Sequence, residues 1–241
     1  IIQELNCCGL NAYEAGYEQV ARKIARKNFE VLKENNIKKI ITNCPECYKM
    51  FKKDYKKIMP DWDIQVLNIW EIIKEKLRKK PRLIKNFSKE QITYHDPCCL
   101  SKHTGIIKQP REILESIGYE IIEMQDNKEK SMCAGSCGGL MINDKELSEK
   151  IGYERLLQAK RKKIKKVVVT SMKNYYLLKN LTKEIQVEEL SNELIKAMNI
   201  KKQPLIIKDE EDKIITDIKS DEKIKQEIKE EEYTEEDEDI L

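Results

Sequence analysis

Eight cysteines lie in four short groups along the sequence, and their spacing predicts metal chemistry. Thiolates are soft ligands for iron and zinc, a Cys-x-x-Cys loop lets two sulfurs reach one centre, and a second pair distant in the sequence can complete the ligand shell. We therefore expect iron–sulfur or zinc sites, while the spacing alone leaves redox thiols or plain buried cysteines as alternatives. The groups are Cys7-Cys8, Cys44 with Cys47, Cys98-Cys99, and Cys133 with Cys137.

Further polar candidates occur in YHDPCCLSKHTG (residues 94–105) and shortly after it. His95 is interpreted either as a hydrogen-bond donor or proton carrier beside a cluster, or as a strand-end histidine that bonds a backbone carbonyl. His103 is expected in a surface loop. Arg111 could face an anionic partner or pair with a nearby glutamate. Asp96 and Glu123 are carboxylates that nothing in the sequence places together.

Composition limits the function classes. The 241 residues are 37% charged, which is typical of a cytosolic protein whose thiols are reduced. No apolar run reaches the ~18 residues of a membrane span, and there is no Gly-rich phosphate loop, so neither a span nor a nucleotide site is predicted. Residues 208–241 hold 16 acidic side chains against 6 basic ones. The lysines of the basic remainder are dispersed, which does not favour nucleic-acid binding.

Helical and strand-like segments alternate, which predicts an α/β fold with parallel sheets. The cysteine groups fall at the ends of predicted strands, where such sheets place their sites. The expected helices lie near residues 11–36, 46–58, 70–79 and 109–118, and the expected strands near 37–42, 63–69, 91–97 and 118–124.

An internal repeat organises these elements. Residues 36–77 run through a Lys-Lys entry, a β-branched strand, a helix, an IQV strand and a second helix, and residues 163–198 repeat this order. The repeat predicts two Rossmann-like lobes, residues 1–85 and 90–200. The acidic, low-complexity segment 201–241 is expected to be a disordered tail.

The order of the cysteine motifs is similar to that of a known family. CCG (7–9) and CPEC (44–47), followed by HDPC (95–98) and CAG (133–135), resemble the duplicated cysteine-rich (CCG) domain of heterodisulfide reductase catalytic subunits. The same domain occurs in iron–sulfur oxidoreductases that serve glycolate, lactate and anaerobic glycerol-3-phosphate oxidation. Each repeat of the family carries one leading cysteine, a Cys-Cys-Gly and a Cys-x-x-Cys.

The resemblance implies a first cluster, of the 4Fe-4S or noncubane type. The leading cysteine of that repeat would fall upstream of Ile1, so we expect an N-terminally truncated chain. The ligands implied for the first cluster are Cys7, Cys8, Cys44 and Cys47.

The second repeat departs from the family pattern. Ala134 stands where the second cysteine of Cys-Cys-Gly is expected, and Ser171 and Asn174 stand where the Cys-x-x-Cys would be. Either nearby cysteines complete a rearranged second site, or the lobe keeps the fold without a cluster. The candidate ligands of this second site are Cys98, Cys99, Cys133 and Cys137.

By resemblance, the chain is expected to be an iron–sulfur subunit of an oxidoreductase complex, transferring electrons to or from a disulfide, a quinone or a flavoprotein. Its expected partners are other subunits: a flavoprotein, a ferredoxin-like protein or a membrane cytochrome. The expected location is the cytoplasm, free or at the periphery of a membrane complex. The alternative is a zinc-stabilised scaffold subunit without redox turnover.

Overall fold

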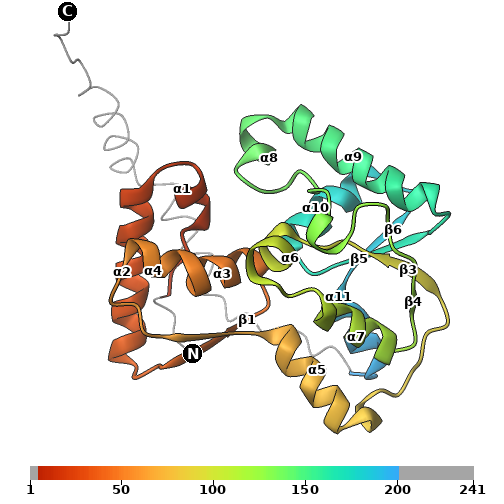
Figure 1. Cartoon of the computed structure of the whole chain (residues 1–241), viewed down its shortest axis with the longest axis horizontal. Helices are drawn as coiled ribbons and strands as arrows, with labels where there is room; N and C mark the ends of the chain where they lie inside the picture. Colours follow the sequence, from red (N-terminus) through yellow and green to blue (C-terminus); the bar gives the residue numbers. More distant parts are fainter. Residues whose placement is uncertain (1–4, 201–241) are drawn as a thin grey trace, which may run out of the picture. The chain divides into compact units, whose positions relative to one another are not determined.

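The N-terminal elements of the chain form a small parallel sheet with its covering helices (Figure 1). The computed structural model describes residues 5–200, and the predicted acidic tail 201–241 lies outside the described residues. Strands β1 (Lys39–Thr42) and β2 (Gln65–Asn68) pair in parallel, with Lys39 opposite Gln65. The surrounding helices are α1 (Leu10–Glu14), α2 (Glu18–Glu34), α3 (Pro45–Lys49) and α4 (Tyr55–Ile58), with a π-helical turn at Met50–Asp54.

The helix expected over residues 11–36 is divided into α1 and α2. Gly16 separates the two with a φ of 89°, a left-handed conformation that ends the first helix. In α2 the buried positions include Ala21, Ala25 and Phe29, four residues apart, so one stripe of the helix faces the core. Phe29 lies 5.4 Å from Trp62, ring centre to ring centre.

A four-stranded parallel sheet, in the order β4-β3-β5-β6, forms the larger part of the fold. Its strands are β3 (Gln91–Tyr94), β4 (Glu120–Ile121), β5 (Lys166–Val169) and β6 (Gln186–Glu189). The helices are α5 (Ile69–Lys79), α6 (Cys98–Thr104), α7 (Lys108–Ser116), α8 (Leu140–Asn143), α9 (Lys145–Arg161), α10 (Met172–Leu181) and α11 (Leu190–Ala197), and 3₁₀ turns occupy Pro81–Leu83 and Lys128–Lys130.

Strand β5 shows how this sheet is buried on both faces. Val168 joins the core that contains residues of α7 and α11, whereas Val167 and Val169 join the core beneath α9 and α10. Successive strand residues point to opposite faces, so a run of three valines places apolar side chains into both layers. The α/β class with parallel sheets is therefore confirmed.

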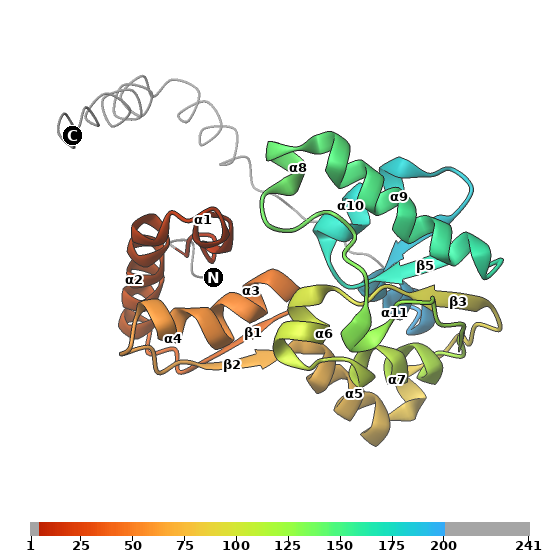
Figure 2. The same cartoon turned by 45° about the horizontal axis from the view of Figure 1, so that its top comes forward.

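The predicted repeat is present in the order and pairing of the elements. The segment β1-α3-β2-α5 is matched by β5-α10-β6-α11, and the strands of each pair are parallel neighbours. The division at residues 85–90 stays a prediction, because one apolar core runs from Phe29 in the first sheet's layer to Tyr94 and Val168 in the second sheet. Helix α3 packs against α6 (Figure 2), which brings the starts of two cysteine-bearing helices together.

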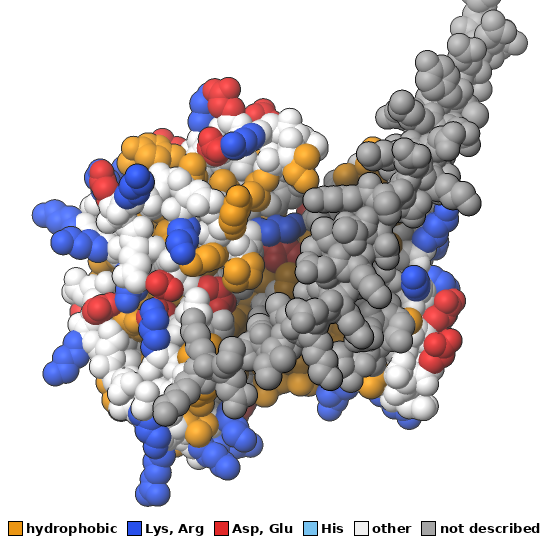
Figure 3. All heavy atoms as spheres, turned by 180° about the vertical axis from the view of Figure 1, so that it is seen from behind, with side chains coloured by type: hydrophobic (Ala, Val, Ile, Leu, Met, Phe, Trp, Pro, Cys, Tyr) orange, Lys and Arg blue, Asp and Glu red, His pale blue; other side chains and the backbone are white. Residues whose placement is uncertain are grey.

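The distribution of surface charge and the lengths of the helices concern possible nucleic-acid and membrane partners. Across the face drawn in Figure 3, lysine and arginine side chains stand apart from one another among acidic and apolar ones, as on an ordinary solvated surface. Within residues 5–200, no helix combines the length and the apolar character needed to cross a bilayer.

Candidate metal centres

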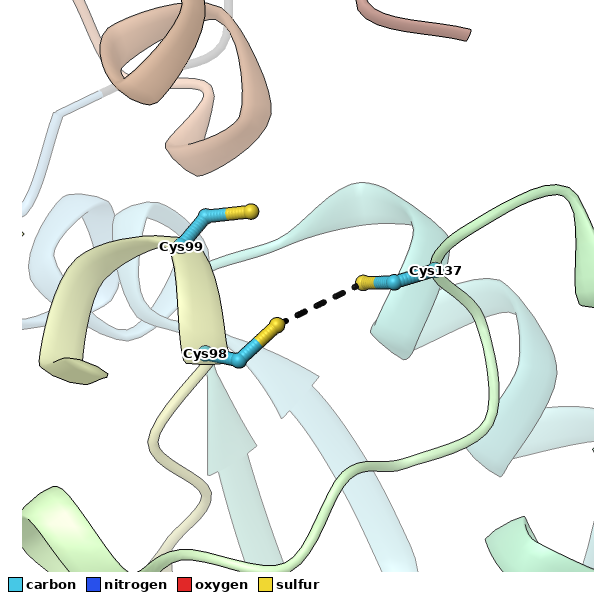
Figure 4. Close-up of side chains that lie close together, drawn as sticks. All are labelled: Cys98, Cys99 and Cys137. Atoms are coloured by element: carbon cyan, nitrogen blue, oxygen red, sulfur yellow. Dashed lines mark hydrogen bonds between the residues drawn. The ribbon is translucent and has the colours of Figure 1, made fainter. Parts of the chain in front are cut away.

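Three of the eight free cysteines converge closely at the end of β3. Pro97 leads directly into α6, so Cys98 and Cys99 stand on its first turn, while Cys137 lies on the loop before α8 (Figure 4). The Sγ atoms of Cys98 and Cys137 are 3.8 Å apart, and the three sulfurs all lie within 4.8 Å of one another. The structure thus brings together three of the four cysteines expected at the second site.

Cys133 stands at the edge of this group. Its side chain is exposed, and its Sγ accepts a hydrogen bond of 3.3 Å from the Gly135 backbone N–H. The neighbouring thiols, Cys133 first and then Cys137 and Cys99, lower the pKa of Cys98. The thiols of Cys133, Cys98 and Cys99 raise the pKa of Cys137.

The loop that carries Cys133 and Cys137 contains a glycine, Gly135, at a position where a side chain would clash with the backbone. Gly135 has a φ of +91°, and a Cβ built on it would lie 2.3 Å from the Ser148 carbonyl oxygen. In return, the Ser148 hydroxyl donates a 2.8 Å hydrogen bond to the Gly135 carbonyl. Close backbone packing and a backbone N–H that points at a cysteine sulfur are both typical of metal-binding loops.

The first four cysteines meet at the starts of α1 and α3. Cys44 caps α3: its Sγ accepts a hydrogen bond of 3.4 Å from the Cys47 N–H, and Pro45 occupies the first turn. A hydrogen bond from Cys47 lowers the pKa of buried Cys8 to about 7. The thiol contacts with Cys44 and Cys8 raise the pKa of Cys47. Cys7 is exposed and contributes a hydrogen bond to Cys8.

This donor set fits an iron–sulfur cluster. Four thiols are available, one of them with a pKa close to neutrality, and thiolate is the form that binds metal. Within residues 5–200, no compact triple of sulfurs occurs among these four cysteines, in contrast to the second group. Cys7, Cys8, Cys44 and Cys47 stay the predicted ligands of the first cluster.

Buried Glu46 links the first cysteine group to the start of α10, although its only notable feature in the sequence is its place between Cys44 and Cys47. The Cys44 thiol donates to its Oε2 at 3.2 Å, and the Ser171 hydroxyl donates to its Oε1 at 2.7 Å. Ser171 caps α10 through the Asn174 N–H, as Cys44 caps α3 through the Cys47 N–H. Asn174 in turn accepts a hydrogen bond from the Ser136 hydroxyl. The residues at the absent Cys-x-x-Cys therefore hold neighbouring loops in place.

His95 is a buried, neutral side chain. Its Nδ1 accepts a 3.0 Å hydrogen bond from the Arg155 Nε, so its ring proton lies on Nε2. Burial and then the positive charge of Arg155 hold the pKa of His95 well below 6.5. A guanidinium 60 residues away in the sequence thus takes the place of the expected backbone carbonyl. The role of His95 beside a cluster stays a prediction. His103, expected on the surface, is an exposed residue of α6.

Arg111 pairs with two carboxylates of the protein. It forms two hydrogen bonds of 2.7 and 2.8 Å with Asp96 and two of 2.7 and 3.0 Å with Glu123. The two carboxylates that the sequence could not place together therefore share one guanidinium. Asp96 also accepts a 2.8 Å hydrogen bond from the Lys128 N–H, so this cluster anchors the segment that leads to Cys98.

Comparison with known proteins shows where these motifs recur. The model of a family described as a cysteine-rich domain, CCG, matches residues 1–52 and 92–179. A probable iron–sulfur-binding oxidoreductase, FadF, of Bacillus subtilis is 33% identical over 147 residues, which cover 60% of this chain and 20% of that protein.

Two further relatives carry similar names. One subunit of the dihydromethanophenazine:CoB–CoM heterodisulfide reductase of Methanosarcina barkeri is 30% identical over 158 residues, covering 64% of this chain and 39% of that protein. An EtfAB:quinone oxidoreductase of Syntrophomonas wolfei is 33% identical over 158 residues, covering 62% of this chain and 21% of that protein. The chain thus spans between a fifth and two fifths of the length of these curated relatives.

Proposed function

Because the chain belongs to the family of cysteine-rich (CCG) domain proteins, we propose that it is an electron-transferring iron–sulfur part of an oxidoreductase complex. The names of its relatives support this proposal: they are oxidoreductases, and one is called iron–sulfur-binding. The observation that carries it in the structure is the capping of α3 by the Cys44 sulfur, which accepts from the Cys47 N–H, with buried Cys8 close enough to Cys47 that the pKa of Cys8 is lowered to about 7.

The proposed ligands of the cluster are Cys7, Cys8, Cys44 and Cys47. A bound iron–sulfur cluster supplies one-electron transfer at a potential that depends on its charge, its hydrogen bonds and its exposure to solvent. A four-iron cluster, cubane or noncubane, is the proposed type.

The residues around the ligands would set that potential. The Cys47 N–H already donates to the Cys44 sulfur, and such N–H donors stabilise the more negative, reduced state. Cys8 is 4% exposed and Leu10 is 2% exposed, so this side of the site is shielded from water. Gly9, with a φ of +80°, lets the backbone turn from the cysteine pair directly into α1.

We propose that the electrons pass between this cluster and a disulfide, a quinone or a flavoprotein bound through another subunit. The support comes from relatives named after a heterodisulfide and after a quinone. Anaerobic oxidation of the reduced protein by a disulfide, a quinone analogue and an oxidised flavoprotein would rank the three by rate. Equal, slow rates with all three would argue against an electron acceptor of these classes.

The ligand assignment is tested by electron paramagnetic resonance of the anaerobically purified, dithionite-reduced chain. We expect a cluster signal in the unchanged protein and in Ser116→Ala, a control whose hydroxyl donates to the Ile113 carbonyl. Cys47→Ser should abolish or strongly alter the signal. A signal that is the same in all three proteins would remove Cys47 from the ligands, and zinc in place of iron would favour the scaffold alternative.

A further inference from the structure

We propose that the open edge of strand β1 binds one further parallel β-strand, supplied by another subunit of the complex, with an acidic residue directly before that strand. The inference goes beyond the proposed function, which concerns the cysteines and their cluster, and rests on that function only in taking the strand from another subunit. The two halves of the internal repeat, compared residue by residue, support it.

The two halves of the repeat pair their strands in the same register. In each pair, a lysine at the start of one strand lies opposite a glutamine at the start of the other. The pairs are Lys39 with Gln65 and Lys166 with Gln186. In both, the N–H of the glutamine donates to the carbonyl of the residue before the lysine, at 2.9 and 2.7 Å. Each residue of β1 therefore has a counterpart on β5, and Ile41 corresponds to Val168.

The outer strands β2 and β6 are buried alike, but β1 and β5 are not. In both outer strands the first residue is exposed, and the second and fourth residues are buried. In contrast, Ile41 is 54% exposed, whereas its counterpart Val168 is 0% exposed. Ile40 is half-buried, and its counterpart Val167 is buried. Since the β2 side matches the β6 side, the exposure of β1 reflects its other edge.

Strand β3 covers that edge of β5 and has no counterpart beside β1. It pairs with β5 in parallel, with Tyr94 opposite Val168, and the His95 N–H donates to the Val168 carbonyl at 2.9 Å. Among residues 5–200, β2 is the only strand that pairs with β1 (Figure 2). The carbonyl of Ile41 corresponds to the carbonyl that bonds β3, so it lies on the open edge. Backbone groups on such an edge are a template for a further strand.

The charge at the start of the strand indicates the chemistry of the added segment. Lys166 of β5 forms an ion pair of 2.5 Å with Glu90, which directly precedes β3. Its counterpart Lys39 is exposed and forms no ion pair with another residue of the range 5–200. A lysine at this position is compatible with pairing, because Lys166 lies in a strand that is paired on both sides. A strand that binds β1 as β3 binds β5 therefore has an acidic residue at the position of Glu90.

The added strand is expected to be apolar on both faces. In β3, Ile92, Thr93 and Tyr94 are each 0% exposed, as is usual for a strand inside a parallel sheet. A side chain of the size of Tyr94 would remove Ile41 from water. Main-chain hydrogen bonds would supply affinity, and the side chains would supply specificity. Because Cys44 follows β1 by two residues, such a strand would end beside the first cysteine group.

The first test is hydrogen–deuterium exchange of the full 241-residue chain, alone and with a synthetic peptide of the sequence of residues 88–95, SKEQITYH. At a peptide concentration of about ten times its Kd, we expect the β1 amides to exchange about tenfold more slowly. A peptide that carries Glu90→Lys should bind about fivefold more weakly, which is the upper range for an exposed ion pair. A scrambled peptide of the same composition should have no effect.

A matched pair of variants locates the binding surface. Ile41→Lys should abolish the effect of the peptide, because it places a charge where the added strand would bury a side chain. Val20→Lys changes another exposed β-branched residue, which is 47% exposed on α2, and should leave the effect unchanged. Both variants should keep the iron content and the cluster signal of the unchanged chain, so a failure of the proposed function is seen separately.

The proposal is overturned if the peptide at millimolar concentration does not slow exchange in β1, if the scrambled peptide acts equally, or if Ile41→Lys and Val20→Lys respond alike. The comparison of the SKEQITYH peptide with its Glu90→Lys form uses the unchanged chain and decides the question even if Ile41→Lys fails to fold. Equal binding of these two peptides would contradict the predicted acidic residue.

The source of the strand is tested by carbodiimide cross-linking of the chain purified from its own host together with its bound subunits. The reagent joins a lysine to a carboxylate that contacts it. We expect Lys39 to be joined to an aspartate or glutamate of a different polypeptide, directly before a β-branched run. A link from Lys39 to an acidic residue of this same chain, the segment 208–241 included, or no link at all, would overturn the assignment to another subunit.

Discussion

Replacement of Arg111 by methionine is expected to destabilise the protein strongly, because the guanidinium is the shared partner of two carboxylates. The side chain of Arg111 is 9% exposed, that of Asp96 is 1% exposed and that of Glu123 is 29% exposed. Methionine keeps most of the volume of the side chain but leaves Asp96 buried without its cation. Removing one partner of a buried ion pair costs about 3–5 kcal/mol, since the remaining charge has lost its compensation.

The assay is equilibrium urea unfolding under anaerobic conditions, followed by circular dichroism. For a denaturant slope of about 2 kcal/mol per molar urea, a loss of about 4 kcal/mol lowers the midpoint by about 2 M. The control is Arg78→Met, because Arg78 pairs with Glu75 at 2.9 Å on the surface and is 69% exposed. An exposed pair of this kind is worth about 0–1 kcal/mol.

The reasoning is refuted if Arg111→Met and Arg78→Met unfold at the same urea concentration. A second variant sharpens the test: Asp96→Asn combined with Arg111→Met removes both charges of the tightest pair. It should recover part of the stability that Arg111→Met loses, because the uncompensated carboxylate is then absent.

Three further predictions concern the loops and the acid range. Gly135→Ala should lower the free energy of unfolding more than Gly105→Ala does. Both positions carry the roughly 1–2 kcal/mol cost of a left-handed residue, but of the two only Gly135 would place its Cβ 2.3 Å from a carbonyl oxygen. Equal losses in urea unfolding would contradict this reasoning. Ser171→Ala should cost about 1–3 kcal/mol of unfolding free energy, because it leaves a buried oxygen of Glu46 without its hydrogen-bond donor. A loss below the error of urea unfolding would contradict the contact. Burial alone would raise the pKa of Asp54, but hydrogen bonds from two lysines outweigh burial and lower this pKa below 3.8. The stabilisation by the Asp54 carboxylate is thus complete well above pH 3.8 and is lost as the pH falls through the lowered pKa. Asp54→Asn should therefore flatten the acid limb of a stability–pH profile.

The strands and the grouping of cysteines could be predicted because their signals are local. A run of β-branched residues such as Val167–Val169 predicts a strand without help from distant residues. The end of the predicted strand then shows where the next loop begins. The internal repeat also indicated which strands pair, because two similar β-α-β segments fold in the same way. The break at Gly16 was missed, since an isolated glycine within a helical pattern does not say whether the helix continues.

The partners of the buried charges could not be predicted, because they come from distant parts of the chain. Arg155 reaches His95 from 60 residues away, and Ser171 reaches Glu46 from 125 residues away. Arg155 lies on a helix whose sequence is polar on most sides, so nothing marked it as buried. Such contacts depend on how α9 and α10 pack on the sheet, which hydrophobic periodicity alone does not fix.

The most direct test of the central claim is the iron and acid-labile sulfide content of the anaerobically purified chain. If Cys7, Cys8, Cys44 and Cys47 hold a four-iron cluster, the protein should be brown and contain about four irons and a similar amount of sulfide per chain. Protein that contains zinc but neither iron nor sulfide would contradict the account.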